Sequence, residues 1–183
     1  MRNILFPILL LLSIVPMQAQ RIVVGAEQMD AILNCTQDKH IAVVANQASL
    51  VGNRHLVDTL LSCGVDIQLI MSPEHGFRGD AEAGAHVQSG KDAQTGLPIL
   101  SLYGNNKKPS STQLQGITLV IFDLQDVGCR FYTYISTLHY VMEACAENGV
   151  PLMVLDRPNP NGFYVDGPIL DMQYKSGVGW LPI

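Results

Sequence analysis

The strongest constraint on the fold is a series of short apolar segments that recur between amphipathic stretches. The clearest of them, residues 118–124, reads TLVIFDL, and residues 41–45 read IAVVA. Such runs lack the alternation of a half-exposed strand and are typical of strands covered on both faces. Further apolar runs at 67–71, 99–103 and 151–155 predict three more strands.

The segments between these strands have helical periodicity. They predict helices at 27–33, 55–63 and 134–147. Alternating strands and helices give a parallel sheet with helices on both faces, so we expect an α/β fold with an open, doubly wound, mostly parallel Rossmann-like sheet. A long glycine-containing loop at 72–97 is of the kind that is usually functional. No GxGxxG motif follows the first strand, so a nicotinamide cofactor is not expected.

Composition narrows the class of protein further. The chain has 183 residues, 48% of them hydrophobic, and a formal net charge of −5, which indicates a globular protein with a real core. A weakly acidic chain without a Lys/Arg cluster argues against nucleic acid as a partner, although a single Arg could still hold a small anion.

The cysteines are widely spaced, at Cys35, Cys63, Cys129 and Cys145, and form no CxxC or Cys/His ligand pattern. A zinc site is therefore not expected. No disulfide is predicted, and buried free thiols are expected at Cys35, Cys63 and Cys145, which lie in or beside apolar helical stretches.

The N-terminus has the pattern of an export signal over residues 1–20. Arg2 precedes an apolar run at 4–15, and Met17-Gln18-Ala19 offers a cleavage site. The run is short for a membrane span, so we expect an exported protein, periplasmic or secreted, without a membrane anchor after cleavage. An uncleaved anchor is the alternative.

Polar residues follow four of the five expected strands. Open parallel sheets bind ligands beyond the carboxyl ends of their strands, so these residues are candidates for a site, although loops are polar in any case. The candidates are Asn46, Glu74, His75, Arg78, Asp123, Asp126, Arg130, Tyr132, Arg157 and Asn159.

Glu74 is the leading candidate for a catalytic group. A carboxyl group in a partly apolar cleft keeps its proton more readily, because charging it there costs solvation, and a general acid needs that proton. An exposed loop glutamate is the structural alternative. His75 could orient Glu74 or serve the fold. Asp126 could be a second catalytic group, a partner of Arg157 or a binder of sugar hydroxyl groups. Asp123 could cap a turn or pair with Arg130.

The remaining candidates suit ligand binding. Arg78 and Arg130 could grip a carboxylate, since a guanidinium presents a matching pair of donors. Tyr132 could stack on a ring of the ligand. The prolines of the DRPNPNG segment make a rigid turn that could hold Arg157 and Asn159 toward the crevice.

Four segments together carry a family resemblance. VANQA at 44–48, SPEHGFRG at 72–79, DLQDVGCRFYTY at 123–134 and DRPNPNG at 156–162 resemble the NamZ-type exo-β-N-acetylmuramidases. The resemblance spans about residues 40–183. It implies a Rossmann-like N-terminal domain that carries the cleft and a smaller C-terminal domain that closes over it.

The resemblance also implies domain limits. The Rossmann-like catalytic domain would occupy residues 21–166. Members of the family are considerably longer than this chain, so residues 167–183 are expected to be the start of a truncated C-terminal region.

The activity that the resemblance implies is release of non-reducing terminal N-acetylmuramic acid (MurNAc) from peptidoglycan fragments such as MurNAc-GlcNAc. Glu74 would be the acid/base, and the lactyl carboxylate of the sugar would fit the arginine candidates. The family needs no metal or organic cofactor. The expected partner is a small saccharide, and the oligomeric state stays open.

Two other functions remain possible at this stage. One is a non-catalytic periplasmic sugar-binding module, which needs the same crevice but no proton donor. The other is a metal-dependent hydrolase built on Glu74, His75, Asp123 and Asp126, although the adjacent Glu74-His75 pair lacks the helical spacing of HExxH.

Overall fold

The computed structural model describes residues 22–79 and 89–183, and the expected export signal lies outside these residues. In this part of the chain, six strands form one sheet in the order β5–β6–β4–β1–β7–β8. All neighbouring strands are parallel except the edge pair β5–β6. The strands are β1 (Ile41–Ala45), β4 (Ile67–Ser72), β5 (Gly90–Lys91), β6 (Pro98–Ser101), β7 (Leu119–Asp123) and β8 (Leu152–Val154).

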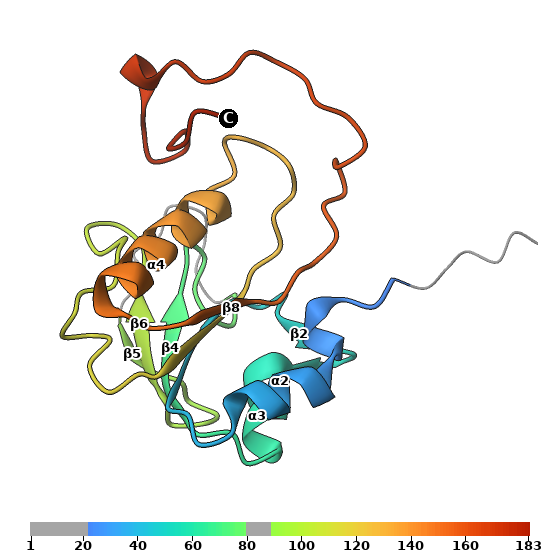
Figure 1. Cartoon of the computed structure of the whole chain (residues 1–183), viewed down its shortest axis with the longest axis vertical. Helices are drawn as coiled ribbons and strands as arrows, with labels where there is room; N and C mark the ends of the chain where they lie inside the picture. Colours follow the sequence, from blue (N-terminus) through green and yellow to red (C-terminus); the bar gives the residue numbers. More distant parts are fainter. Residues whose placement is uncertain (1–21, 80–88) are drawn as a thin grey trace, which may run out of the picture.

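Helices cover both faces of this sheet, as the apolar strands predict. Figure 1 shows α4 on one face and α2 and α3 on the other. Neighbouring residues of β1 enter opposite cores: Val43 packs with Leu60 of α3, and Val44 with Val141 of α4. The expected α/β fold with a mostly parallel sheet is confirmed. The helices are α2 (Met29–Thr36), α3 (Leu56–Ser62) and α4 (Tyr134–Asn148), with 3₁₀ turns η1 (Gly25–Glu27) and η2 (Met172–Tyr174).

Helix ends follow local chemistry. The helix α4 ends where Gly149 adopts a left-handed φ of 64°, which glycine reaches without steric cost.

The first expected helix is displaced. Residues 25–27 form the 3₁₀ turn η1, and the α-helix begins only at Met29, because Gln28 at ψ 56° interrupts the helical path.

The sequence patterns missed three short strands. A small antiparallel hairpin joins β2 (Leu50–Val51) to β3 (Arg54–His55), and β5 lies inside the segment expected to be a loop at 72–97. Each of these strands has two residues, which is too short to show any hydrophobic period.

The four cysteines are free thiols, but their burial differs from the expectation. Cys145 is buried, and burial raises the pKa of its thiol to about 11. Cys35 and Cys63 are exposed, because they lie at the outer ends of α2 and α3 rather than against the sheet. None of the helices in residues 22–79 and 89–183 is long and apolar enough to cross a membrane.

His55 links the hairpin to the main sheet. Its Nε2 lies 2.9 Å from the carbonyl oxygen of Asn46, its Nδ1 lies 3.2 Å from the backbone nitrogen of Val57, and its ring packs edge-on against Phe77. The neutral ring satisfies both contacts by donating from Nε2 and accepting at Nδ1. Burial lowers the pKa of His55 below its ordinary value of 6.5.

Stability should therefore fall on acidification. The unfolded chain takes up the His55 proton near pH 6.5, while the folded chain resists it, so this contribution is complete above pH 6.5 and is lost as the pH drops toward the folded pKa. We expect a lower urea midpoint at pH 5.5 than at pH 7.5. The fall should be smaller in His55→Gln, which removes the titrating group. An equal fall in both proteins would contradict this origin.

Candidate functional site

The end of β4 places Glu74 at the carboxyl edge of the sheet. The strand stops at Ser72, and Pro73 stiffens the exit from it. His75 and Gly76 then both have left-handed φ angles, of 73° and 83°. The chain therefore turns sharply directly after Glu74, which leaves its half-buried side chain at the strand end rather than along a continuing strand.

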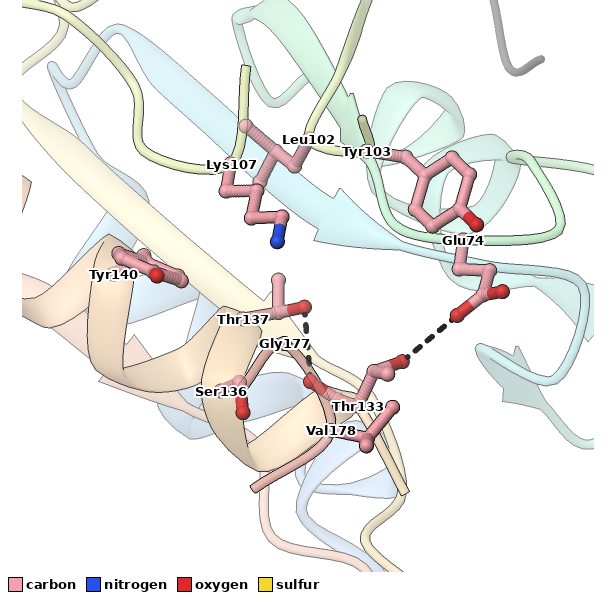
Figure 2. Close-up of a pocket in the computed structure, with 10 residues that line it drawn as sticks. All are labelled: Glu74, Leu102, Tyr103, Lys107, Thr133, Ser136, Thr137, Tyr140, Gly177 and Val178. Carbon is pink, nitrogen blue, oxygen red and sulfur yellow. Dashed lines mark hydrogen bonds between the residues drawn. The ribbon is translucent and has the colours of Figure 1, made fainter. Parts of the chain in front are cut away.

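A cavity of about 210 Å³ lies beside this turn. Figure 2 shows its wall, which combines the ends of β4 and β6, the first turns of α4 and a segment near the C-terminus. Among the candidates from the sequence, Glu74 lines it. The lining residues are Glu74, Leu102, Tyr103, Lys107, Thr133, Ser136, Thr137, Tyr140, Gly177 and Val178.

A hydroxyl group at the start of α4 contacts the Glu74 carboxyl group. Thr133 Oγ1 donates to Glu74 Oε2 over 3.2 Å (Figure 2). Tyr103 lies on the same cavity wall, and the negative charge of Glu74 is the main cause of the raised pKa of Tyr103. The hydrogen bond from Thr133 thus holds the carboxyl group at the cavity wall.

Asn46 supports this arrangement from inside the protein. Its Nδ2 donates to the hydroxyl of Tyr134 over 2.9 Å, and its Oδ1 accepts from the backbone of Ala48. Burial raises the pKa of Tyr134 to about 12, so the phenol stays neutral. Tyr132 packs edge-on against this ring at 4.8 Å. Asn46 therefore anchors the start of α4, next to Thr133, while its proposed contact with a ligand stays a prediction.

Asp123 and Arg157 form a buried ion pair. Arg157 Nε donates to Asp123 Oδ1 over 2.6 Å and Nη2 to Oδ2 over 2.9 Å, and Nη2 also reaches the carbonyl of Leu50. Asp123 is wholly buried, so it needs this counter-charge. Asp123 and Arg157 therefore pair with each other. The two alternatives from the sequence, Asp123 with Arg130 and Asp126 with Arg157, are wrong.

Arg78 is also held by carboxylates. Its guanidinium donates to both oxygens of Asp58 and both oxygens of Asp92, at 2.8 to 3.2 Å. The hydrogen bonds from Arg78 are the main cause of the lowered pKa of Asp92. Arg78 thus ties α3 to the segment directly after β5, and it lies outside the cavity wall. A ligand carboxylate would have to displace one of these two acids.

The other candidates lie away from the cavity wall. Arg130 donates to the carbonyl of Pro168, while its Nε and one oxygen of Asp126 are buried without a partner among the described residues. The Asn159 Oδ1 accepts from the backbone of Asn161. The roles proposed for Asp126, Arg130, Asn159, and also for His75 and Tyr132, stay predictions.

The four residues of the metal alternative do not gather. In the part of the chain that the structure describes, no group of three or more His, Cys, Asp or Glu residues is placed to hold a metal ion. Both oxygens of Asp123 are taken by Arg157, which removes one of the four presumed ligands.

Several cavity residues were not found by sequence reasoning. Thr133 lies within the YTY stretch of a motif that drew attention to Tyr132, and Lys107 lies in the turn-rich stretch after the third expected strand. Neither has a signal of its own, because a Thr before a helix reads as a helix cap and a Lys in a turn reads as solvated.

The fold and the site together define a class: a Rossmann-like α/β domain with a carboxyl group in a hydroxyl-lined cavity at the carboxyl edge of its sheet. A family model described as "Exo-beta-N-acetylmuramidase NamZ, N-terminal" matches residues 41–183. The chain belongs to this family.

Relatives of known sequence and structure agree with this assignment. The chain is 49% identical over 148 residues to the "Peptidoglycan beta-N-acetylmuramidase NamZ" of Bacillus subtilis (strain 168), covering 79% of this chain and 36% of that protein. Two crystal structures of DUF1343 family proteins from Bacteroides fragilis NCTC 9343 match with TM-scores of 0.79, at 48% and 35% identity. Each match covers 90% of this chain and 42% of the solved chain. The chain therefore spans well under half the length of these relatives.

The buried ion pair yields a test of its structural role. Arg157→Met would leave the Asp123 carboxylate buried without a counter-charge, which should lower the free energy of unfolding by about 3–5 kcal/mol. Urea denaturation measures this loss. The control is Lys108→Met, because Lys108 pairs with the exposed Glu143 and Glu147 and should change stability by less than about 1 kcal/mol. Equal effects of the two substitutions would show that Arg157 is not a structural anchor.

Proposed function

We propose that this chain carries the proton-donating half of a cell-wall glycosidase. Its substrate would be a peptidoglycan fragment, such as MurNAc-GlcNAc, with MurNAc at the non-reducing end. Membership of the NamZ family supports this proposal, as does 49% identity to a protein named as a peptidoglycan β-N-acetylmuramidase.

The observation that carries the proposal is the position of Glu74. Its carboxyl group lies at the wall of the cavity, at the strand-end edge where open α/β sheets bind ligands, and the hydroxyl group of Thr133 donates a hydrogen bond to it. A general acid must be held within hydrogen-bonding reach of the atom that it protonates, and such fixed placement meets that requirement.

The chemistry assigned to Glu74 is a proton transfer. As the bond between C1 of MurNAc and the glycosidic oxygen breaks, the Glu74 proton passes to that oxygen, so the remaining sugar leaves as an alcohol. Water supplies the hydroxyl group that C1 gains and the proton that returns to Glu74. The net reaction consumes one water molecule.

The cavity itself suits one sugar ring. Five of its lining residues carry hydroxyl groups, namely Tyr103, Thr133, Ser136, Thr137 and Tyr140. Its volume, about 210 Å³, lies below the roughly 300–1,000 Å³ of pockets for drug-sized ligands. A cavity of this size fits a single terminal sugar better than several units of a chain, in keeping with an exo-acting enzyme.

Replacing the proton donor tests the proposal. Glu74→Gln keeps the shape of the side chain but removes the acid, so release of MurNAc from an aryl β-N-acetylmuramide should fall by about 10²- to 10⁴-fold. The matched control is Glu143→Gln, an exposed glutamate on α4 that pairs with Lys108. Activity of Glu74→Gln within a few-fold of the parent would contradict the role of Glu74.

A second candidate function is a sugar-binding module without turnover, which would use the same cavity. Calorimetry with free MurNAc distinguishes the two: binding without release of MurNAc from the aryl glycoside supports the module.

We further propose that the chain is exported and cleaved near residue 20. Arg2, the apolar run at 4–15 and Ala19 support this. Intact mass measurement of the protein from the periplasm or medium of an expressing bacterium should give an N-terminus within a few residues of Gln20. A protein of uncleaved mass in the cytosol would contradict export.

A further inference from the structure

We infer that Lys107 is the residue that recognises a carboxylate on the ligand of this cavity, and that this carboxylate is the lactyl group of MurNAc. The inference deepens the proposed function and rests on it, because it names the residue that would distinguish MurNAc from sugars without an acid. None of the arginines singled out from the sequence has this position.

The first step concerns which cations are free. Arg78 is held by two aspartates, and Arg157 is held by Asp123. Lys108, next in the chain, pairs with Glu143 and Glu147. Within residues 22–79 and 89–183, the ammonium group of Lys107 makes no hydrogen bond or ion pair with a protein group.

The second step concerns position. Lys107 follows β6 and is the cationic residue on the cavity wall, as far as the structure describes the chain. Figure 2 shows its ammonium group directed across the cavity toward Thr137 of α4, apart from the Glu74 carboxyl group. A ligand can therefore contact Lys107 with one substituent while another part of it lies beside Glu74.

The third step concerns space. A Cβ atom added at Gly177 would lie 3.1 Å from Lys107 Nζ. The absence of a side chain at this position leaves the ammonium group room for a ligand atom on that side.

The fourth step is electrostatic. A ligand carboxylate that enters the cavity loses part of its hydration, and the positive charge of Lys107 in the same cavity offsets that cost. A charge-assisted hydrogen bond from an ammonium group is about twice as strong as a neutral one. A sugar without the acid gains nothing from Lys107, so this residue would favour MurNAc over N-acetylglucosamine.

The experiment is calorimetric titration of the chain with free MurNAc and with free N-acetylglucosamine, which lacks the lactyl group. The parent should bind MurNAc more tightly. Lys107→Met should weaken MurNAc binding by about tenfold to a hundredfold and leave N-acetylglucosamine binding unchanged. Lys107→Arg, which keeps the charge, should retain most of the preference, and Lys108→Met serves as the matched control.

The outcomes separate the two proposals. If the parent prefers MurNAc and Lys107→Met keeps that preference, the saccharide function stands and the assignment of Lys107 is overturned. If the parent shows no preference for MurNAc, the proposed function fails and the inference fails with it. The melting temperatures of both lysine variants should match that of the parent, since Lys107 is exposed. If Lys107→Met melts at a lower temperature, the test uses Lys107→Arg and added salt instead. Salt should then weaken binding of MurNAc and leave binding of N-acetylglucosamine unchanged.

Discussion

The burial of both faces of β1 and β7 is the constraint on which the rest of the structure depends. Every residue of these two strands is buried, so neither strand has an exposed face that could carry polar chemistry. Parallel strands end at the same edge, and the residues at or just after those ends meet there. Asn46, Glu74 and Asp123 lie at that edge for this reason.

Charged side chains at the carboxyl edge of the sheet have two different roles. Around β1 and β7, the wholly buried Asp123 needs a counter-charge, and Arg157 supplies it with a matched pair of donors. Arg78 performs a similar task for Asp58 and Asp92. The guanidinium groups are thus used to hold the fold together. Among the described residues, the cavity at β4 and β6 is lined by the carboxyl-bearing Glu74, the ammonium-bearing Lys107 and a mixture of apolar and hydroxyl-bearing residues.

The sequence predicts features whose cause is local and misses those whose cause is tertiary. β1 and β7 could be predicted because an unbroken apolar run has few other interpretations, and Glu74 because it follows such a run. The hairpin of β2 and β3 could not, since two residues show no period. Nor could the pair of Asp123 and Arg157, because the fold alone brings together residues 34 positions apart. Lys107 lies in no recognisable sequence motif. Only the direction of its side chain in the folded protein identifies it as a candidate binding residue.

The cavity also shows that the limit drawn at residue 166 from the sequence does not divide the site from the rest of the chain. Trp180 packs on Tyr140 of α4 with ring centroids 4.7 Å apart, and the ammonium group of Lys175 lies 3.4 Å from the centre of the Trp180 ring. Such aromatic and cation–π contacts are each worth about 0.5–1.5 kcal/mol, enough to favour one path for the segment between them. That path carries Gly177 and Val178 to the cavity wall (Figure 2). The end of strand β4 therefore supplies the carboxyl group, and residues 177 and 178 supply another part of the same wall, so the cavity depends on segments far apart in the chain.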